Sequence, residues 1–247
     1  MSSVVTSSKI VPVRKDRLHD RVVRHLALRV IRGYEENIEV FLPTETDLCR
    51  QMEVSRTILR EAVKVLAAQG LLDVRPKTGM RVRPRREWNL TDPELLTSLC
   101  EAGLDAHMVR AIWEVRGAIE PMAAELAATR ATQEEIEQIH SILRRMEETM
   151  DDWEVFLQAD TQFHQAIVAA CHNEFLERMC RNISVALHAS RGVTAHERRN
   201  IEEAMPLHRA IAGAIAHRDA SAARAATTLL LSQAAQQIDA ALRSSRA

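Results

Sequence analysis

The sequence has little glycine, proline or aromatic residue: 7 Gly, 7 Pro, three Trp, one Tyr and four Phe among 247 residues. Sandwiches and barrels are rich in aromatic and turn residues, and collagen-like chains need far more glycine. These classes are therefore excluded. Alanine, leucine, arginine and glutamate abound instead, and 46% of the residues are hydrophobic, so the composition predicts a mainly α-helical protein with a buried core.

Long apolar runs and paired cysteines are also missing. No run of about 18 apolar residues occurs, and residues 1–15 lack the apolar core of a secretory signal. We therefore expect a cytoplasmic protein with no membrane partner. The four cysteines form no C-x-x-C pair and lie far apart, which indicates buried thiols rather than a zinc cluster or disulfides: Cys49, Cys100, Cys171 and Cys180.

The net charge of −1 conceals two halves of opposite sign. Residues 1–86 hold 18 Lys and Arg against 10 Asp and Glu, whereas residues 87–247 hold 15 against 24. A basic module can neutralise phosphates, and an acidic module is repelled by them. The charge division thus predicts a nucleic-acid-binding N-terminal part and a C-terminal part with a different partner.

Residues 1–12 show no periodicity and are expected to form a flexible tail, and residues 13–83 are predicted to contain three helices. Apolar residues at i, i+4 and i+8 indicate a first helix from Lys15 to Arg32, with Gly33 as its stop. The second helix starts after the N-cap Thr44 and ends near Met52.

The third helix follows the N-cap Ser55 and runs to Gln69. At about 100° per residue it separates into an apolar face and a basic face. The apolar face holds Leu59, Ala62, Val63 and Leu66, and the basic face holds Arg56, Thr57, Arg60 and Lys64. A solvated charged face would show the same pattern, so periodicity alone leaves that alternative open.

Residues 71–74 and 80–82 read as two strands around a turn, giving a two-stranded wing beside the third helix. The segments that carry a resemblance are Leu42–Leu48, Val54–Ala62, Gly70–Leu72 and Arg75–Val82. Together they resemble the winged helix-turn-helix of the GntR family of bacterial transcription regulators. The resemblance implies double-stranded operator DNA as a partner, contacted by Ser55, Arg56, Thr57, Arg60, Lys77 and Gly79.

Two positions depart from the family pattern. Thr46 stands where the family often has arginine, and Lys77 replaces the first wing glycine. Both affect which operator is read, while Arg56 and Arg60 can still make bidentate contacts to guanine. For Arg60 the alternative is a surface salt bridge with a neighbouring glutamate, Glu61 or Glu53.

Residues 84–105 are predicted to be a linker with a short helix that starts near Thr91, and residues 106–247 to be entirely helical. The predicted helices cover about 107–128, 132–149, 151–171, 173–192, 195–217 and 219–243, the fifth interrupted near Pro206.

This part resembles the FCD domain, the helical effector-binding and dimerisation domain of the FadR subfamily. The resemblance is carried by Glu114–Glu120, Asp160 with His164, His172–Asn173 and Leu207–His208. It implies a homodimer whose helical bundle holds a carboxylate effector, often on a divalent metal bound by one Asp and three His.

The residues themselves support a metal site. Asp160 shares an apolar stripe with Phe156 and Phe163, His164 follows one turn later, and His208 lies in line with the apolar Ile211. A charged group on a buried stripe must be paired or must hold a cation, and this donor set suits zinc or nickel. The alternative for each histidine is a hydrogen-bonded core residue.

The ligand set is incomplete by the family pattern. The last family histidine would fall 22 residues after His208, where this chain has Leu230, and His188 matches no clear ligand position. We therefore expect Asp160, His164 and His208 as ligands, with water or effector completing the coordination.

Arg116 and Asn173 are the expected effector contacts, because in the family the Arg of the Glu-Val-Arg motif clamps a carboxylate. The alternatives are an Arg116–Glu120 pair along the helix and an N-cap role for Asn173.

The sequence thus predicts a homodimeric repressor released from its operator by a small carboxylate. The run from Arg83 to Leu96 resembles sugar-acid-responsive members of the subfamily, which implies an aldonate such as galactonate. An activator of the same architecture is one alternative. The other is a metal-dependent enzyme on a helical bundle, which would leave residues 13–83 without a role.

Overall fold

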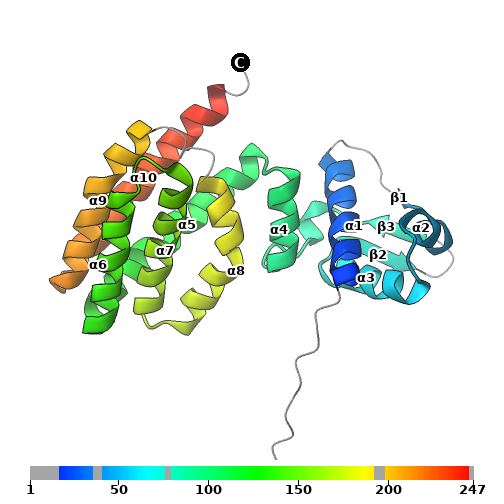
Figure 1. The fold of residues 1–247 in the computed structure, drawn as a ribbon, viewed down its shortest axis with the longest axis horizontal. Helices are drawn as coiled ribbons and strands as arrows, with labels where there is room; N and C mark the ends of the chain where they lie inside the picture. The colour runs from blue at the N-terminus through cyan, green and yellow to red at the C-terminus, as the bar shows by residue number, and fades with distance from the viewer. Residues whose placement is uncertain (1–16, 36–40, 76–78, 192–197, 245–247) are drawn as a thin grey trace, which may run out of the picture. The chain divides into compact units, whose positions relative to one another are not determined.

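The computed structural model describes residues 17–35, 41–75, 79–191 and 198–244, which form two compact units, Met1–Asn89 and Leu90–Ala247 (Figure 1). The predicted tail 1–12 and the wing residue Lys77 lie outside these ranges. None of the described helices is both long enough and apolar enough to cross a membrane. Each unit has its own core and is treated separately.

The first unit contains the three predicted helices, α1 (Arg17–Glu35), α2 (Glu45–Met52) and α3 (Arg56–Ala68). The N-caps are confirmed, because the hydroxyl of Thr44 accepts from the amide of Asp47 and that of Ser55 accepts from the amide of Ile58. The stop at Gly33 is wrong, since α1 continues for two residues beyond it.

The extension of α1 has a tertiary cause. The ring of Tyr34 lies 5.1 Å from that of Trp88, and its hydroxyl accepts from the amide of Arg85 at 3.3 Å. These contacts hold the half-buried Tyr34 against residues 85–88 and favour continued helix over the local tendency of glycine to end it.

The sheet has three strands instead of the two that were predicted. Strands β1 (Phe41–Leu42), β2 (Leu72–Arg75) and β3 (Gly79–Val82) are antiparallel in the order β1-β3-β2. The two wing strands are confirmed, and β1 adds a ladder on the outer edge of β3. Strand β1 is only two residues long, which is too short to show the alternation of apolar and polar residues by which a strand is predicted from sequence.

The second unit is built from seven helices, and its described residues include no strand. They are α4 (Pro93–Ala102), α5 (Ala106–Arg130), α6 (Gln133–Glu148), α7 (Trp153–Ala170), α8 (Glu174–Arg191), α9 (Arg198–Ala216) and α10 (Ala220–Ser244). Helix α5 packs against α7, α9 and α10, and α6 lies beside α7 (Figure 1). The mainly α fold class is confirmed.

Helix α9 continues through Pro206, so the predicted interruption is wrong. Proline removes one backbone hydrogen bond, that of the carbonyl of Glu202 four residues earlier. Because Pro206 lies on the exposed side of α9, water can hydrate that carbonyl, and Ile201 and Met205 keep the helix anchored in the core.

The segment 84–105, expected to be a linker, divides between the two units. Trp88 is buried in the first unit, and the amide of Asn89 donates to the carbonyl of Gln69 at 2.8 Å. Helix α4 packs against α8 in the second unit and is capped by Asp92. The boundary between the units therefore falls between Asn89 and Leu90.

Gly70 permits the close approach of residues 84–89. Its φ is +78°, and a Cβ there would lie 2.2 Å from the carbonyl oxygen of Glu87. Gly79 has a φ of +86° but no atom within 4 Å of such a Cβ. We expect Gly79→Ala to cost about 1 kcal/mol through left-handed strain alone and Gly70→Ala to cost distinctly more.

The comparison is made by urea unfolding of the full chain, with hydrogen exchange identifying the transition of the first unit. Equal losses for the two variants would contradict the assigned role of the Gly70–Glu87 contact.

Candidate functional site

The predicted DNA-reading face of α3 is on the surface. Ser55, Arg56, Thr57 and Arg60 are all exposed, while Leu59 and Leu66 on the opposite face are completely buried. The helix is therefore held to its unit by its apolar side, and its basic side remains accessible to a DNA groove.

Two of the basic residues of α3 pair with acidic neighbours. Arg60 Nε lies 3.0 Å from Glu45 Oε2, and Lys64 Nζ lies 2.7 Å from Glu61 Oε1. The expected alternative partners of Arg60, Glu61 and Glu53, are thus replaced by Glu45 of α2. Exposed pairs of this kind contribute about 0–1 kcal/mol, so a phosphate or base can displace the glutamate from Arg60.

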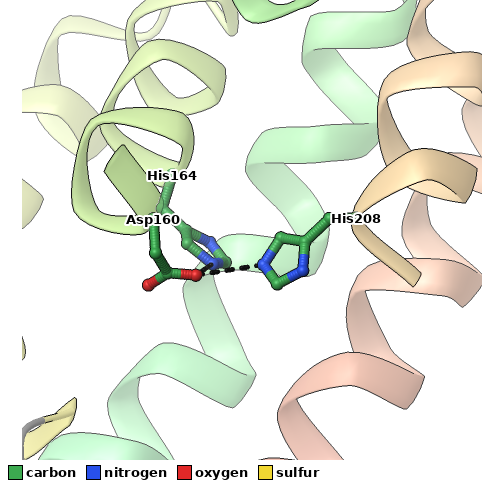
Figure 2. Close-up of side chains that lie close together, drawn as sticks. All are labelled: Asp160, His164 and His208. Carbon is green, nitrogen blue, oxygen red and sulfur yellow. Dashed lines mark ion pairs between the residues drawn. The ribbon is translucent and has the colours of Figure 1, made fainter. Parts of the chain in front are cut away.

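In the second unit, Asp160, His164 and His208 come together in the core (Figure 2). Asp160 and His164 are one turn apart on α7, and His208 comes from α9. Asp160 Oδ1 lies 3.1 Å from His208 Nε2 and 3.7 Å from His164 Nε2. One ligand atom from each residue lies within 4.8 Å of the other two. The predicted ligand set is therefore a spatial cluster.

The hydrogen bonds of the two imidazoles leave Nε2 facing the cluster. His208 Nδ1 lies 3.0 Å from the carbonyl of Ala204, and His164 Nδ1 lies 2.6 Å from Glu120 Oε2. Since a carbonyl and a carboxylate only accept, the proton of each neutral ring is inferred to be on Nδ1. The lone pair of each Nε2 is then available to a metal.

This arrangement fits a divalent cation. His208 is 2% exposed, yet its Nε2 has no hydrogen-bond partner among the described residues. A buried nitrogen lone pair that faces a carboxylate oxygen is costly unless a proton, a metal ion or a water bridges the two atoms. Two imidazoles and one carboxylate suit zinc or nickel and leave coordination positions open.

No described histidine completes a four-residue set. Leu230 lines the cavity beside the cluster at the position where the family has its last histidine. His188 is exposed, with its Nδ1 3.3 Å from the hydroxyl of Thr161, outside the cluster.

The cavity beside the cluster has a volume of about 80 Å³ and is also lined by Arg116 and Trp113. Arg116 is 2% exposed, donates from Nε to Glu120 Oε1 at 2.6 Å and lies 4.0 Å above the centre of the Trp113 ring. The helix-face pair with Glu120 therefore exists. This pair leaves part of the guanidinium unsatisfied, because Arg116 Nη1 is buried and has no hydrogen-bond partner in the described part of the chain. The same holds for the indole nitrogen Nε1 of Trp113.

Asn173 is not brought to this cavity. Its Oδ1 accepts from the amides of Phe175 at 3.1 Å and Leu176 at 3.3 Å, so the structure gives it the capping role on α8. Asn173 also does not line the larger cavity of about 380 Å³ between α7 and α8, which Glu120 and His164 border from the side of the cluster. The expected effector contact of Asn173 is therefore not supported by its position.

Burial raises the pKa of three cysteine thiols, to about 11 for Cys100 and to about 12 for Cys180, and also above the usual range for Cys171. These thiols stay protonated at neutral pH. The expectation of buried thiols is confirmed for Cys171 alone, because Cys49, Cys100 and Cys180 are only partly buried. Glu120 and Trp113 were missed as site residues. The only sequence signal for either is its spacing from Arg116, at i+4 and i−3.

Comparison with known proteins identifies both units. Residues 18–82 match the model of the bacterial regulatory proteins of the gntR family, and residues 111–233 match the FCD domain. The galactonate operon transcriptional repressor of Escherichia coli K12 is 32% identical over 221 residues, covering 89% of this chain and 96% of that protein.

A putative L-lactate dehydrogenase operon regulatory protein of E. coli is 34% identical over 212 residues, covering 80% of this chain and 78% of that protein. The solved structure of Lar, which controls the expression of the Listeria monocytogenes agr system, has a TM-score of 0.56 at 19% identity and covers 93% of this chain and 99% of that one, which supports the fold.

The matched families and relatives are transcription regulators, so the metal-dependent enzyme is rejected. These families account for both the basic, exposed face of α3 in the first unit and the cavity beside the Asp160–His164–His208 cluster in the second. The chain belongs to the GntR family of bacterial regulatory proteins and is a DNA-binding transcription regulator with an FCD domain.

Proposed function

We propose that the chain is a homodimeric repressor that leaves its operator when a small carboxylate binds beside a divalent metal in the second unit. The observation that carries the proposal is a set of buried polar atoms that have no hydrogen-bond partner among the described residues and that belong to residues lining one cavity: His208 Nε2, Arg116 Nη1 and Trp113 Nε1. A nitrogen lone pair together with two N–H donors matches a cation and an anion bound side by side.

On DNA, α3 supplies the contacts. Arg56 and Arg60 are long enough to reach base edges from an exposed helix face, and the hydroxyls of Ser55 and Thr57 suit phosphate oxygens at its N-terminus. Gly79, exposed at the start of β3, lets the wing approach a backbone closely. A two-fold symmetric operator would require a homodimer.

In the second unit, Asp160, His164 and His208 would hold the metal. The bound cation would act as a Lewis acid and attract a carboxylate oxygen. Arg116, anchored by Glu120, can donate to the same carboxylate from Nη1, and Trp113 can donate to a hydroxyl or carboxylate from its indole nitrogen. A hydroxy acid satisfies both kinds of donor.

We propose a sugar acid such as D-galactonate as the effector, supported by the 32% identical galactonate operon repressor. The cavity of about 80 Å³ is smaller than the roughly 300–1,000 Å³ of most ligand pockets, so its size favours a smaller hydroxy acid. The name of a second relative points to L-lactate. Binding would favour a dimer geometry in which the two α3 helices no longer fit their half-sites, which is a coupling free energy between two sites.

Arg56→Ala should weaken binding to a duplex selected from a random pool by the wild-type chain about 5- to 150-fold, because a bidentate contact is worth about 1–3 kcal/mol. Arg199→Ala, on the exposed surface of α9, is the charge-matched control and should bind like wild type. Fluorescence anisotropy at several salt concentrations measures both. Unchanged affinity of Arg56→Ala, or an affinity that does not fall with salt, would refute the DNA model.

Zn²⁺ or Ni²⁺ should raise the melting temperature of the chelator-treated chain, and EDTA should reverse the rise. A metal at about 100 times its Kd adds about 2.7 kcal/mol of stability. His208→Gln should abolish the shift because it removes a buried ligand, whereas His188→Gln should retain it because that histidine lies outside the cluster. A shift of equal size in His208→Gln would place the metal elsewhere.

The effector should release the selected duplex from the metal-loaded chain. D-Galactonate and L-lactate are compared, with neutral D-galactose as the control that lacks a carboxylate. Arg116→Lys keeps a cation for Glu120 but loses Nη1, so it should need about tenfold more of the active acid, equivalent to one charged hydrogen bond of about 1.5 kcal/mol.

Release by D-galactose, or equal sensitivity of wild type and Arg116→Lys, would overturn the carboxylate clamp. In cells, a reporter behind the operator decides the sign of regulation: deletion of the gene should raise expression for a repressor and lower it for an activator.

A further inference from the structure

Glu120 is a buried carboxylate to which neither the DNA surface nor the ligand set assigns a role. It lies on α5 and is 5% exposed. Its Oε1 accepts from Arg116 Nε at 2.6 Å, and its Oε2 accepts from Arg116 Nη2 at 3.3 Å. Oε2 also lies 2.6 Å from His164 Nδ1, on α7.

An ordinary helix-face pair does not account for this geometry. Exposed i, i+4 pairs contribute about 0.3–0.5 kcal/mol and need no third partner. Glu120 instead joins two helices inside the core, and the bidentate guanidinium of Arg116 fixes the plane of the carboxylate. A carboxylate held in this way can in turn fix the ring that donates to it.

The ring fixed by Glu120 is one of the candidate metal ligands. Because Oε2 can only accept, the proton of the neutral imidazole is held on Nδ1, and the Nε2 lone pair is kept on the side of Asp160 and His208. Carboxylate–histidine–metal relays of this kind orient the ligand and raise its basicity, and their loss costs about 10–100-fold in metal affinity.

We propose that Glu120 is a positioning residue for the metal centre: clamped by Arg116, it holds His164 in the tautomer and orientation that direct Nε2 to the ion. The inference rests on the proposed metal site. Helix α5 contributes none of the three candidate ligands. The inference adds that α5 nevertheless controls the metal affinity of the site, because its Glu120 carboxylate contacts the ligand His164.

The test uses Co²⁺ as the probe on the chelator-treated full chain. Its affinity is measured by competition with a coloured chelator, and its visible absorption reports the ligand field. Glu120→Gln removes the charge while keeping the length, and Glu120→Asp keeps the charge while shortening the reach. Glu125→Gln is the matched control, a glutamate on the same helix that pairs with Arg224 at 2.5 Å and lines neither cavity.

We expect Co²⁺ affinity to fall about 10–100-fold in both Glu120 variants, with an altered absorption spectrum, and to stay unchanged in Glu125→Gln. The melting temperature of each metal-free variant shows that it is folded at the temperature of titration. If Glu120→Gln does not fold, Glu120→Asp carries the test alone.

Wild-type affinity and spectrum in Glu120→Gln would overturn the positioning role while leaving the metal site intact. Wild-type behaviour in Glu120→Asp with a loss in Glu120→Gln would show that charge alone matters and would also overturn it. Absence of Co²⁺ binding by the wild-type chain would refute the metal site itself, and this inference with it.

Discussion

The second unit depends on burying a chain of charged and polar groups inside an apolar helical bundle. Arg116, Glu120, His164, Asp160 and His208 follow one another across three helices with contacts of 2.6 to 3.7 Å. Such groups are costly inside a protein unless each is satisfied. The described residues of this unit provide most of the partners, and the three buried atoms left without a hydrogen bond, on Trp113, Arg116 and His208, lie on residues that line a cavity.

This constraint connects folding to ligand binding. A fully apolar core would be stable without any ligand, whereas the present core leaves a nitrogen lone pair and two N–H donors without a hydrogen bond from the part of the chain that the structure describes. A metal and an anion would remove that cost in the folded state alone and would therefore stabilise it. Helix α5, which carries Arg116 and Glu120, packs against both α7 and α9, so a ligand that changes the spacing of the groups acts on the bundle itself.

The first unit follows the opposite arrangement. Arg60 and Lys64 lie on the surface of α3, paired with Glu45 and Glu61, and the buried residues of the unit are apolar apart from Gln69. Weak, screened pairs suit a surface that must exchange its partners for phosphates and bases. Glu87 packs directly against Gly70, and Trp88 is buried in this unit. Residues 84–89 therefore belong to the DNA-binding module rather than to a linker.

The sequence by itself determined the helices, their caps, the two faces of α3 and the inward positions of Asp160, His164 and His208, because periodicity and capping are local properties of the chain. Only the tertiary structure decided that Glu120 meets His164, that Glu45 meets Arg60 and that α1 runs past Gly33. These contacts join residues 15 to 54 positions apart, and a local pattern holds no information about which distant side chain fills the remaining space.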